Sequence, residues 1–251
     1  MSQAAIQVLQ GASRRPAAGP ARPRLLIAGA TGVLGNEVLR RLAGAGAFES
    51  VQILAREPIT AGLRGVQATV MPEQPIDAWP QPAPADVAVV MFDPPRLFYD
   101  RERALWTPAP EQLPALARWL RAGGVHTLAV VLPHAPGRLP DALKRGLASL
   151  DEQAVAGLGF PRLLLLRSAK KPGEAARVSL PQSVARFMLS AFKYMVPSSE
   201  QPVRAAKVAE LLSAALRLAP PGIHVAAPEL VWQAAQGDTE GAARHWLLGA
   251  A

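Results

Sequence analysis

The chain has 251 residues, half of them apolar, enough to bury the core of one large α/β domain or of one domain with a small lobe. It has no cysteine, which excludes disulfides and thiolate metal sites, and its four histidines never fall at a paired ligand spacing, so we predict no metal. The net charge of +8 comes without a basic stripe interleaved with aromatic residues. We therefore predict no nucleic-acid partner and ascribe the charge to an anionic ligand and a solvated surface.

Residues 1–22 are rich in Ala, Pro, Gly and Arg without periodicity, which predicts a disordered or loosely attached tail. The pair Arg14-Arg15 is one feature of a twin-arginine export signal, but prolines interrupt the apolar segment that such a signal requires. No run approaches about 18 uncharged apolar residues. We therefore predict no membrane span and a cytoplasmic protein.

The most informative stretch lies at residues 23–56. An apolar run at 25–28, short enough for a buried parallel strand, is followed by three glycines at a spacing of three, Gly29, Gly32 and Gly35. The residues after them show helical periodicity, and a second apolar run closes the unit. The pattern predicts a strand, a glycine-rich turn, a helix and a second strand.

Such a turn suits the pyrophosphate of a dinucleotide, because backbone N–H groups and the helix dipole favour an anion at a helix N-terminus. The first glycine permits the tight turn, the second lets the backbone approach the phosphates, and the third lets helix and strand pack closely. Since a strand precedes the turn and a helix follows it, we prefer a dinucleotide site to the alternative of a flexible loop. The expected cofactor contacts are Gly29, Ala30, Thr31, Gly32, Val33, Leu34 and Gly35.

The order Gly-Ala-Thr-Gly-Val-Leu-Gly at 29–35 resembles the phosphate loop of the short-chain dehydrogenase/reductase superfamily, especially its extended and atypical members. The resemblance implies a nicotinamide dinucleotide cofactor. Arg56 ends the second strand, where NAD-preferring sites carry an acidic residue and where an arginine suits a 2′-phosphate. We therefore expect NADP(H) in preference to NAD(H). The alternative is that Arg56, which Glu57 follows directly, is an ordinary surface residue.

Further apolar runs alternate with helical patterns, and the chain has no internal repeat. This order predicts a doubly wound parallel sheet, the Rossmann fold, with a small C-terminal helical cap. Further strands are expected at 66–71, 86–92, 127–132, 163–166 and 224–226, and helices at 111–121, 140–156, 180–195, 201–218 and 228–236. We expect a tail at 1–22, a dinucleotide-binding core at 23–170 and a C-terminal segment at 171–251 that completes the same domain.

Residues just past the carboxyl ends of parallel strands face the ligand crevice. Phe92 and Asp93 are therefore candidates to contact the cofactor, although Asp93 could equally initiate a turn before Pro94. Residues 96–108 carry three aromatic residues among five charges. We expect this segment to form either a flap over the crevice or the lead-in to a helix.

The order of segments is similar to a narrower group, the atypical short-chain dehydrogenase-like proteins related to the Tat-interacting oxidoreductase-like protein. Besides the phosphate loop, the resemblance rests on FESV at 48–51, AGGVH at 122–126, GFPR at 159–162 and VR at 203–204. It covers most of residues 23–236, and its phosphate loop alone is specific. The superfamily commonly dimerises through helices flanking strands four and five, so the resemblance allows a homodimer.

Reductases of the superfamily use a Tyr-x-x-x-Lys pair, whose tyrosine exchanges a proton with the substrate carbonyl. This sequence departs from that pattern, because Arg103 and Ser198 stand four residues after its two tyrosines, Tyr99 and Tyr194. Catalytic residues are therefore left unassigned.

Three functions stay open. The first is an oxidoreductase of unknown small-molecule substrate with a relocated acid, for which the candidates are His134, Lys144 and Tyr99. The second is a non-catalytic NADP(H)-binding sensor or scaffold that resembles regulators of the nitrogen-metabolite-repressor type. The third is a protein that keeps the fold with a partly occluded pocket and acts through its protein contacts.

Overall fold

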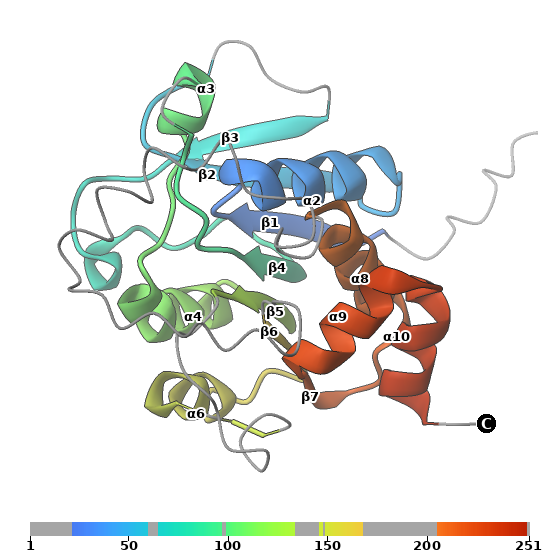
Figure 1. Cartoon of the computed structure of the whole chain (residues 1–251). Helices are drawn as coiled ribbons and strands as arrows, with labels where there is room; N and C mark the ends of the chain where they lie inside the picture. The colour runs from blue at the N-terminus through green and yellow to red at the C-terminus, as the bar shows by residue number, and fades with distance from the viewer. Residues whose placement is uncertain are drawn as a thin grey trace, which may run out of the picture.

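The computed structural model describes residues 22–59, 65–96, 99–133, 146–147, 149–167 and 205–249. In this part of the chain, seven strands form one sheet in the order β3-β2-β1-β4-β5-β6-β7, and all neighbouring strands are parallel (Figure 1). The strand order reverses between β1 and β4, which makes the carboxyl ends of these two strands the topological switch point. The predicted doubly wound Rossmann fold is confirmed.

The elements alternate along the chain as the sequence predicts. The strands are β1 (Arg24–Ala28), β2 (Ser50–Ala55), β3 (Val66–Val70), β4 (Val87–Val90), β5 (Thr127–Leu132), β6 (Arg162–Arg167) and β7 (Gly222–Ala226). The helices are α2 (Gly32–Gly44), α3 (Asp100–Arg103), α4 (Leu113–Ala122), α6 (Leu150–Ala156), α8 (Ala205–Leu218), α9 (Pro228–Gln236) and α10 (Thr239–Leu248), with short 3₁₀ turns η1 (Ile76–Ala78) and η2 (Pro110–Gln112).

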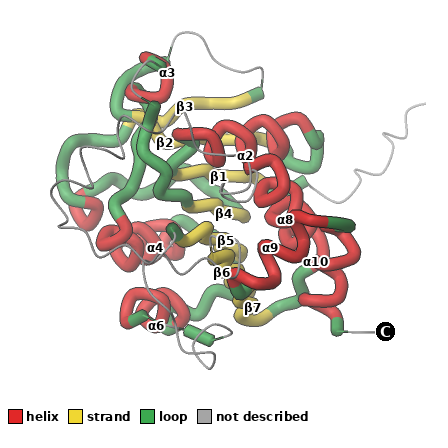
Figure 2. The backbone as a smooth tube through the Cα atoms, in the orientation of Figure 1, coloured by secondary structure: helices red, strands yellow, loops and turns green. Residues whose placement is uncertain are grey.

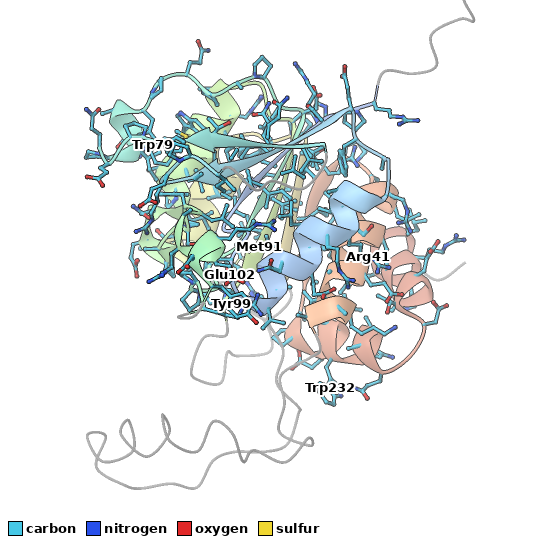
Figure 3. The ribbon with its side chains drawn as sticks, turned by 90° about the horizontal axis from the view of Figure 1, so that it is seen from above. Arg41, Trp79, Met91, Tyr99, Glu102 and Trp232 are labelled. Carbon is cyan, nitrogen blue, oxygen red and sulfur yellow. The ribbon has the colours of Figure 1, made fainter. Side chains whose placement is uncertain are left out.

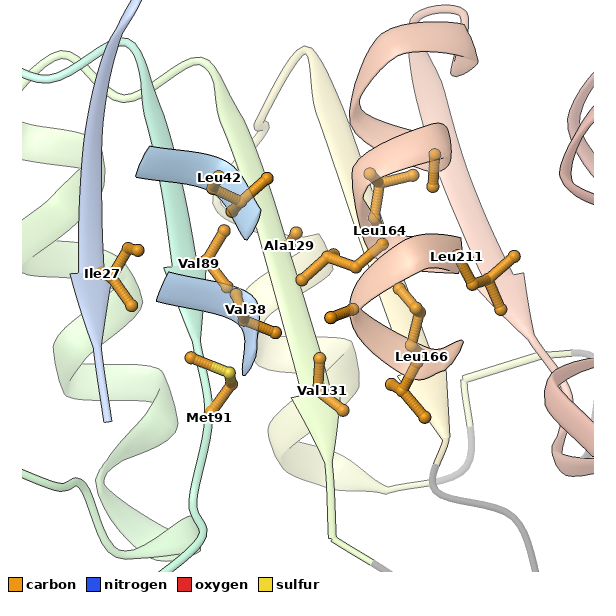
Figure 4. Packing of buried hydrophobic residues seen from close by; sticks show 14 of the residues in the cluster. Ile27, Val38, Leu42, Val89, Met91, Ala129, Val131, Leu164, Leu166 and Leu211 are labelled. Atoms are coloured by element: carbon orange, nitrogen blue, oxygen red, sulfur yellow. The ribbon is translucent and has the colours of Figure 1, made fainter. Parts of the chain in front are cut away.

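Side chains that alternate along the strands supply two cores, one on each face of the sheet. Leu25 and Ile27 of β1 pack with α2, α8, α9 and α10, whereas Leu26 and Ala28 pack with α4 and α6. Figure 2 shows these two groups of helices on opposite sides of the strands. In Figure 4, Val38 of α2 lies over the sheet within the first of these cores. Because both faces are covered, the central strands are continuous apolar runs.

Most predicted elements are present with small changes at their ends. β5 and α9 occupy the predicted residues, and the other strands, apart from β4, differ by one or two residues at an end. The predicted helix at 111–121 begins as the 3₁₀ turn η2 and continues as α4, with a proline in the first turn of each. The predicted helix at 180–195, and the first parts of those at 140–156 and 201–218, lie outside the described residues. The prediction at 140–156 is wrong for residues 146, 147 and 149, because Ser149 is the N-cap of α6 and accepts a hydrogen bond from the Glu152 N–H at 3.1 Å.

The predicted strand at 86–92 is too long at both ends. At its start, the Asp86 carboxylate accepts hydrogen bonds from the Arg24 backbone N–H at 2.8 Å and from the Arg24 side chain at 3.0 and 3.1 Å, so Asp86 serves as a side-chain tie to β1. At its end, the Met91 N–H donates to the carbonyl of Ala28, the last residue of β1. No ladder partner on β1 remains for Phe92, and the chain turns away from the sheet.

The C-terminal part belongs to the same sheet and covers one of its faces. β7 pairs in parallel with β6, and α8 packs beside α2 and α10 (Figure 1). The sequence analysis did not predict α10, whose N-cap residue Asp238 accepts a hydrogen bond from the Glu240 N–H at 3.0 Å. Within the described residues, no helix is long and apolar enough to cross a membrane.

Candidate dinucleotide site

The glycine-rich turn between β1 and α2 has the conformation that its glycines were expected to permit. Gly29 and Gly32 have φ angles of +77° and +67°, a region that strains any residue with a side chain. A Cβ atom at Gly29 would lie 2.0 Å from the Met91 carbonyl oxygen, and one at Gly35 would lie 2.5 Å from the Ala30 carbonyl carbon. The first and third glycines therefore allow a tight turn and close packing of the helix, the roles that such glycines have in dinucleotide-binding turns.

Thr31 links this turn by a hydrogen bond to the segment just after β4. Its fully buried hydroxyl donates to the Asp93 carbonyl oxygen at 2.5 Å and lies 2.8 Å from the Thr107 hydroxyl. It makes no capping bond to the amides of α2, so those amides are left for another acceptor. Of the other loop residues, Ala30 is buried and Val33 is exposed.

One such acceptor is Glu102, a residue of α3. The Gly32 backbone N–H donates to Glu102 Oε2 at 3.0 Å, and the Asn36 side-chain amide donates to Oε1 at 2.7 Å. Arg96 adds its backbone N–H at 2.9 Å and its guanidinium. Glu102 is only 3% exposed. Figure 3 shows it beside one end of α2, with Arg41 near the other end of the helix. The N-terminus of α2 is therefore an anion-binding position that holds a carboxylate of the same chain.

The electrostatics keep this carboxylate ionised. Burial alone would raise the pKa of Glu102, but the hydrogen bonds from the Arg96 side chain and from the backbone N–H groups of Arg96 and Gly32, together with the charge of Arg96, lower the pKa below its ordinary value. Glu102 is thus an ionised carboxylate at the start of α2, paired with the Arg96 guanidinium.

The backbone that follows Glu102 runs across the carboxyl ends of β1 and β2. We call residues 99–108 the strap. The Trp106 carbonyl accepts from the Gly29 N–H at 3.2 Å, the Trp106 N–H donates to the Leu54 carbonyl at 3.0 Å, and the Ala104 carbonyl accepts from the Arg56 N–H at 2.7 Å. The described part of residues 96–108 therefore lies across these strand ends, as expected for a flap, and it also leads into η2 and α4.

The remaining predicted contacts surround the strap. Arg56 is exposed at the end of β2, and its guanidinium has no ion-pair partner among the described residues. Phe92 is half-buried and packs on the core that includes α4. Asp93 lies against Gly32, where its Cβ would be 2.8 Å from a Cβ added to the glycine. Burial raises the pKa of Asp93, and the Leu34 N–H offsets this only in part.

The candidate acids are not assembled in the described part of the chain. Tyr99 is half-exposed at the start of α3, where the Arg96 guanidinium carbon lies 3.8 Å from the centre of its ring. His134 and Lys144 lie outside the described residues. The described residues also contain no cluster of His, Asp and Glu side chains that could hold a metal ion. The arrangement of the described residues can bind an anion at the glycine turn.

Glu102 and Asn36 were not among the predicted site residues. Asn36 stands one helical turn after Gly32 and also donates to its carbonyl at 2.7 Å, a spacing that could have been noticed. Glu102 lies 70 residues from Gly32 within a run of mixed charges, and nothing in that run distinguishes it from its neighbours.

No family model and no curated protein sequence matches the chain. Solved structures do resemble it. A protein from Burkholderia pseudomallei described as exported is 20% identical over 78% of this chain and 93% of its own, with a TM-score of 0.40. UDP-N-acetylglucosamine 4-epimerase from Bacillus cereus is 16% identical over 82% of this chain and 78% of its own, with a TM-score of 0.43.

A Rossmann-fold NAD(P)-binding family protein from Shigella flexneri is 13% identical over 72% of this chain and 91% of its own, with a TM-score of 0.37. The chain is a Rossmann-fold protein. At such low identities the likeness concerns the fold and not the activity.

Proposed function

We propose that this Rossmann-fold protein binds NADP(H) at the N-terminus of α2 and acts as a sensor of the cofactor, without transferring hydride. The observation that carries the proposal is the Gly32 N–H, which already holds a carboxylate oxygen at 3.0 Å on a turn shaped by Gly29 and Gly35. A group that stabilises one buried anion in this way offers the same amide and the same helix dipole to a pyrophosphate.

The position of Arg56 supports NADP(H) over NAD(H). Its guanidinium is exposed at the carboxyl end of β2, the strand whose end meets the adenosine ribose in Rossmann folds. Its five N–H donors suit a phosphate monoester, and its lack of an ion-pair partner in the described chain leaves them available.

The absence of a Tyr-x-x-x-Lys pair from the sequence supports sensing over catalysis. The chain has no Tyr-x-x-x-Lys pair, and Tyr99 lies on the outside of α3 under the Arg96 guanidinium. A reductase would need an acid near the nicotinamide, supplied by His134, Lys144 or another group. Consumption of NADPH with a carbonyl substrate would favour that second function.

The test is a calorimetric titration of the whole chain with NADPH and with NADH, followed by a search for turnover. We expect NADPH to bind at least about tenfold more tightly, the effect of one charged hydrogen-bond pair of roughly 1.4 kcal/mol. Arg56→Asp should reverse this preference, and Gly32→Val should abolish binding because a side chain there meets Asp93 at a positive φ.

Gly44→Val is the matched control, since a Cβ at Gly44 meets no atom within 4 Å. Far-UV circular dichroism would establish that each variant is folded. Equal binding of NADPH and NADH by the wild-type chain would refute the role of Arg56, and normal binding by Gly32→Val would refute the site.

A further inference from the structure

We propose that the strap is a built-in competitor of the dinucleotide, held closed by the Glu102 carboxylate, so that NADP(H) binds only as the strap leaves the carboxyl ends of β1 and β2. This inference rests on the proposed function and adds the way in which the site is regulated. It follows from contacts that the strap makes with the groups that a pyrophosphate would need.

The first contact is the anion position itself. Glu102 takes the Gly32 N–H and the Asn36 amide at 3.0 and 2.7 Å, and it is buried. A phosphate oxygen cannot accept from the same Gly32 N–H while the carboxylate stays there, because two anions within about 4 Å repel each other strongly. Binding at this turn therefore requires Glu102 to depart.

The second contact is the backbone of the turn and of β2. The strap uses the Gly29 N–H, the Leu54 carbonyl and the Arg56 N–H, and Leu105 forms an antiparallel bridge with Ala55. These atoms line the path from the glycine turn to Arg56, which is the path a dinucleotide would follow. The strap therefore blocks more than the phosphate position.

The third observation is that Glu102 is the buried charged anchor of the strap. α3 has only four residues, and its side chains at Asp100 and Arg103 pair with each other in solvent. The buried anchors of the strap are Glu102, Leu105 and Pro108. Loss of the Glu102 contacts would remove this charged anchor and leave the Thr31–Thr107 contact and the backbone hydrogen bonds to hold the strap. The Arg96 guanidinium would then lie near the start of α2 without its carboxylate partner.

The strap also carries an intrinsic reporter. The indole of Trp106 makes an edge-to-face contact with that of Trp79, with ring centroids 4.9 Å apart. Trp79 in turn contacts Trp119 of α4 at 5.3 Å. Movement of the strap would separate Trp106 from this cluster and change the tryptophan fluorescence.

The experiment compares the wild-type chain with Glu102→Gln, which keeps the shape of the side chain and removes its charge. Glu111→Gln is the matched control, because Glu111 is exposed on η2 and makes no contact with the turn. Each chain is titrated with NADP⁺, which does not absorb the tryptophan emission, and amide hydrogen exchange is measured with and without it. We expect Glu102→Gln to bind NADP⁺ at least about tenfold more tightly, as expected for removal of one like charge close to the phosphates, and Glu111→Gln to match the wild type.

Without ligand, the amides of Arg56 and Trp106 should exchange faster in Glu102→Gln than in Glu111→Gln. In the wild-type chain, NADP⁺ should speed exchange at the same two amides and alter the tryptophan emission. This second measurement needs no variant, so a Glu102→Gln chain that failed to fold would leave the proposal open to refutation.

The outcomes separate the two proposals. If the wild type binds NADP⁺ while its strap amides stay protected, or if Glu102→Gln binds no more tightly, the competitor role is wrong and the proposed function stands. If no folded chain binds NADP⁺, the proposed function is wrong, and so is the competitor role. This holds even if exchange without ligand shows that Glu102 keeps the strap in place.

Discussion

The two edges of the sheet are built in opposite ways. At the amino edge, where the strands begin, a cavity of about 280 Å³ lies between the carboxyl ends of α2 and α8. It is lined by Pro23, Leu42, Ala45, Ala47, Phe48, Val87, His126, Thr127, Arg162, Ser213, Leu216 and Arg217. At the carboxyl edge, where the fold places its ligands, the strap fills the ends of β1 and β2.

The cavity at the amino edge and the anion-binding position at the start of α2 thus lie at opposite edges of the sheet. The amino-edge cavity lies at the carboxyl ends of α2 and α8, where Arg162 donates to the Leu216 carbonyl at 3.1 Å. At the other edge, the N-terminus of α2 binds an anion through the Gly32 N–H. The anion-binding position at the start of α2 is occupied, because the chain supplies the Glu102 carboxylate there. Three changes test this contrast between the edges.

The largest effect is expected at the carboxyl edge, where β6 ends in Arg167. Arg167 Nη2 lies 2.7 Å from Glu152 Oε2, and both side chains are buried. Arg167→Met should lower the free energy of unfolding by about 3–5 kcal/mol, because it leaves a carboxylate in the core without its cation. Urea denaturation measures this, with Arg118→Met, in an exposed pair with Asp77, as the control expected to cost less than about 1 kcal/mol. An equal loss of unfolding free energy in Arg167→Met and Arg118→Met would contradict a larger stabilising contribution from the buried pair.

A smaller effect is expected from Asp86 at the amino edge. The hydrogen bond from the Arg24 side chain, with the Arg24 backbone N–H and charge, lowers the pKa of Asp86 despite some burial. The pair is partly exposed, so Asp86→Asn should lower the free energy of unfolding by only about 1 kcal/mol at neutral pH.

The pH dependence of that loss has a definite sign. Because the folded-state pKa of Asp86 is below its ordinary value of 3.8, its contribution is complete above that value and disappears as the pH falls through the folded-state pKa. The difference between wild type and Asp86→Asn should therefore shrink in acid, in denaturation curves recorded from neutral pH down to about pH 2. A difference that stayed constant over this range would contradict the ion-pair explanation.

The smallest effect is expected from filling the amino-edge cavity. Ala47→Leu adds apolar volume at its exposed rim, far from the glycine turn, and should change the affinity for NADP⁺ by less than about twofold, as for a surface substitution. Calorimetric titrations of Ala47→Leu and Gly32→Val with NADP⁺ would measure the change in affinity of each variant. A large loss in Ala47→Leu with none in Gly32→Val would move the ligand to the amino edge.

Much of the fold could be read from local patterns. The apolar run before Gly29 and the helical periodicity after Gly35 predict β1 and α2 because a buried parallel strand and an amphipathic helix each have their own period. Element ends were less predictable. β4 ends at Val90, opposite Ala28, the last residue of β1, and α10 was missed because its apolar positions are sparse.

By itself, the sequence determined the order of strands and helices, the conformation of the glycine turn and the presence of an arginine at the end of β2, since each depends on residues close together in the chain. Only the tertiary structure decided what faces that turn. Glu102 reaches Gly32 across 70 residues because the strap crosses β1 and β2, and its charge is accepted in the interior only where Arg96, Asn36 and the helix amides converge on it. Such a convergence has no local signature, because it depends on backbone paths that the whole sheet sets.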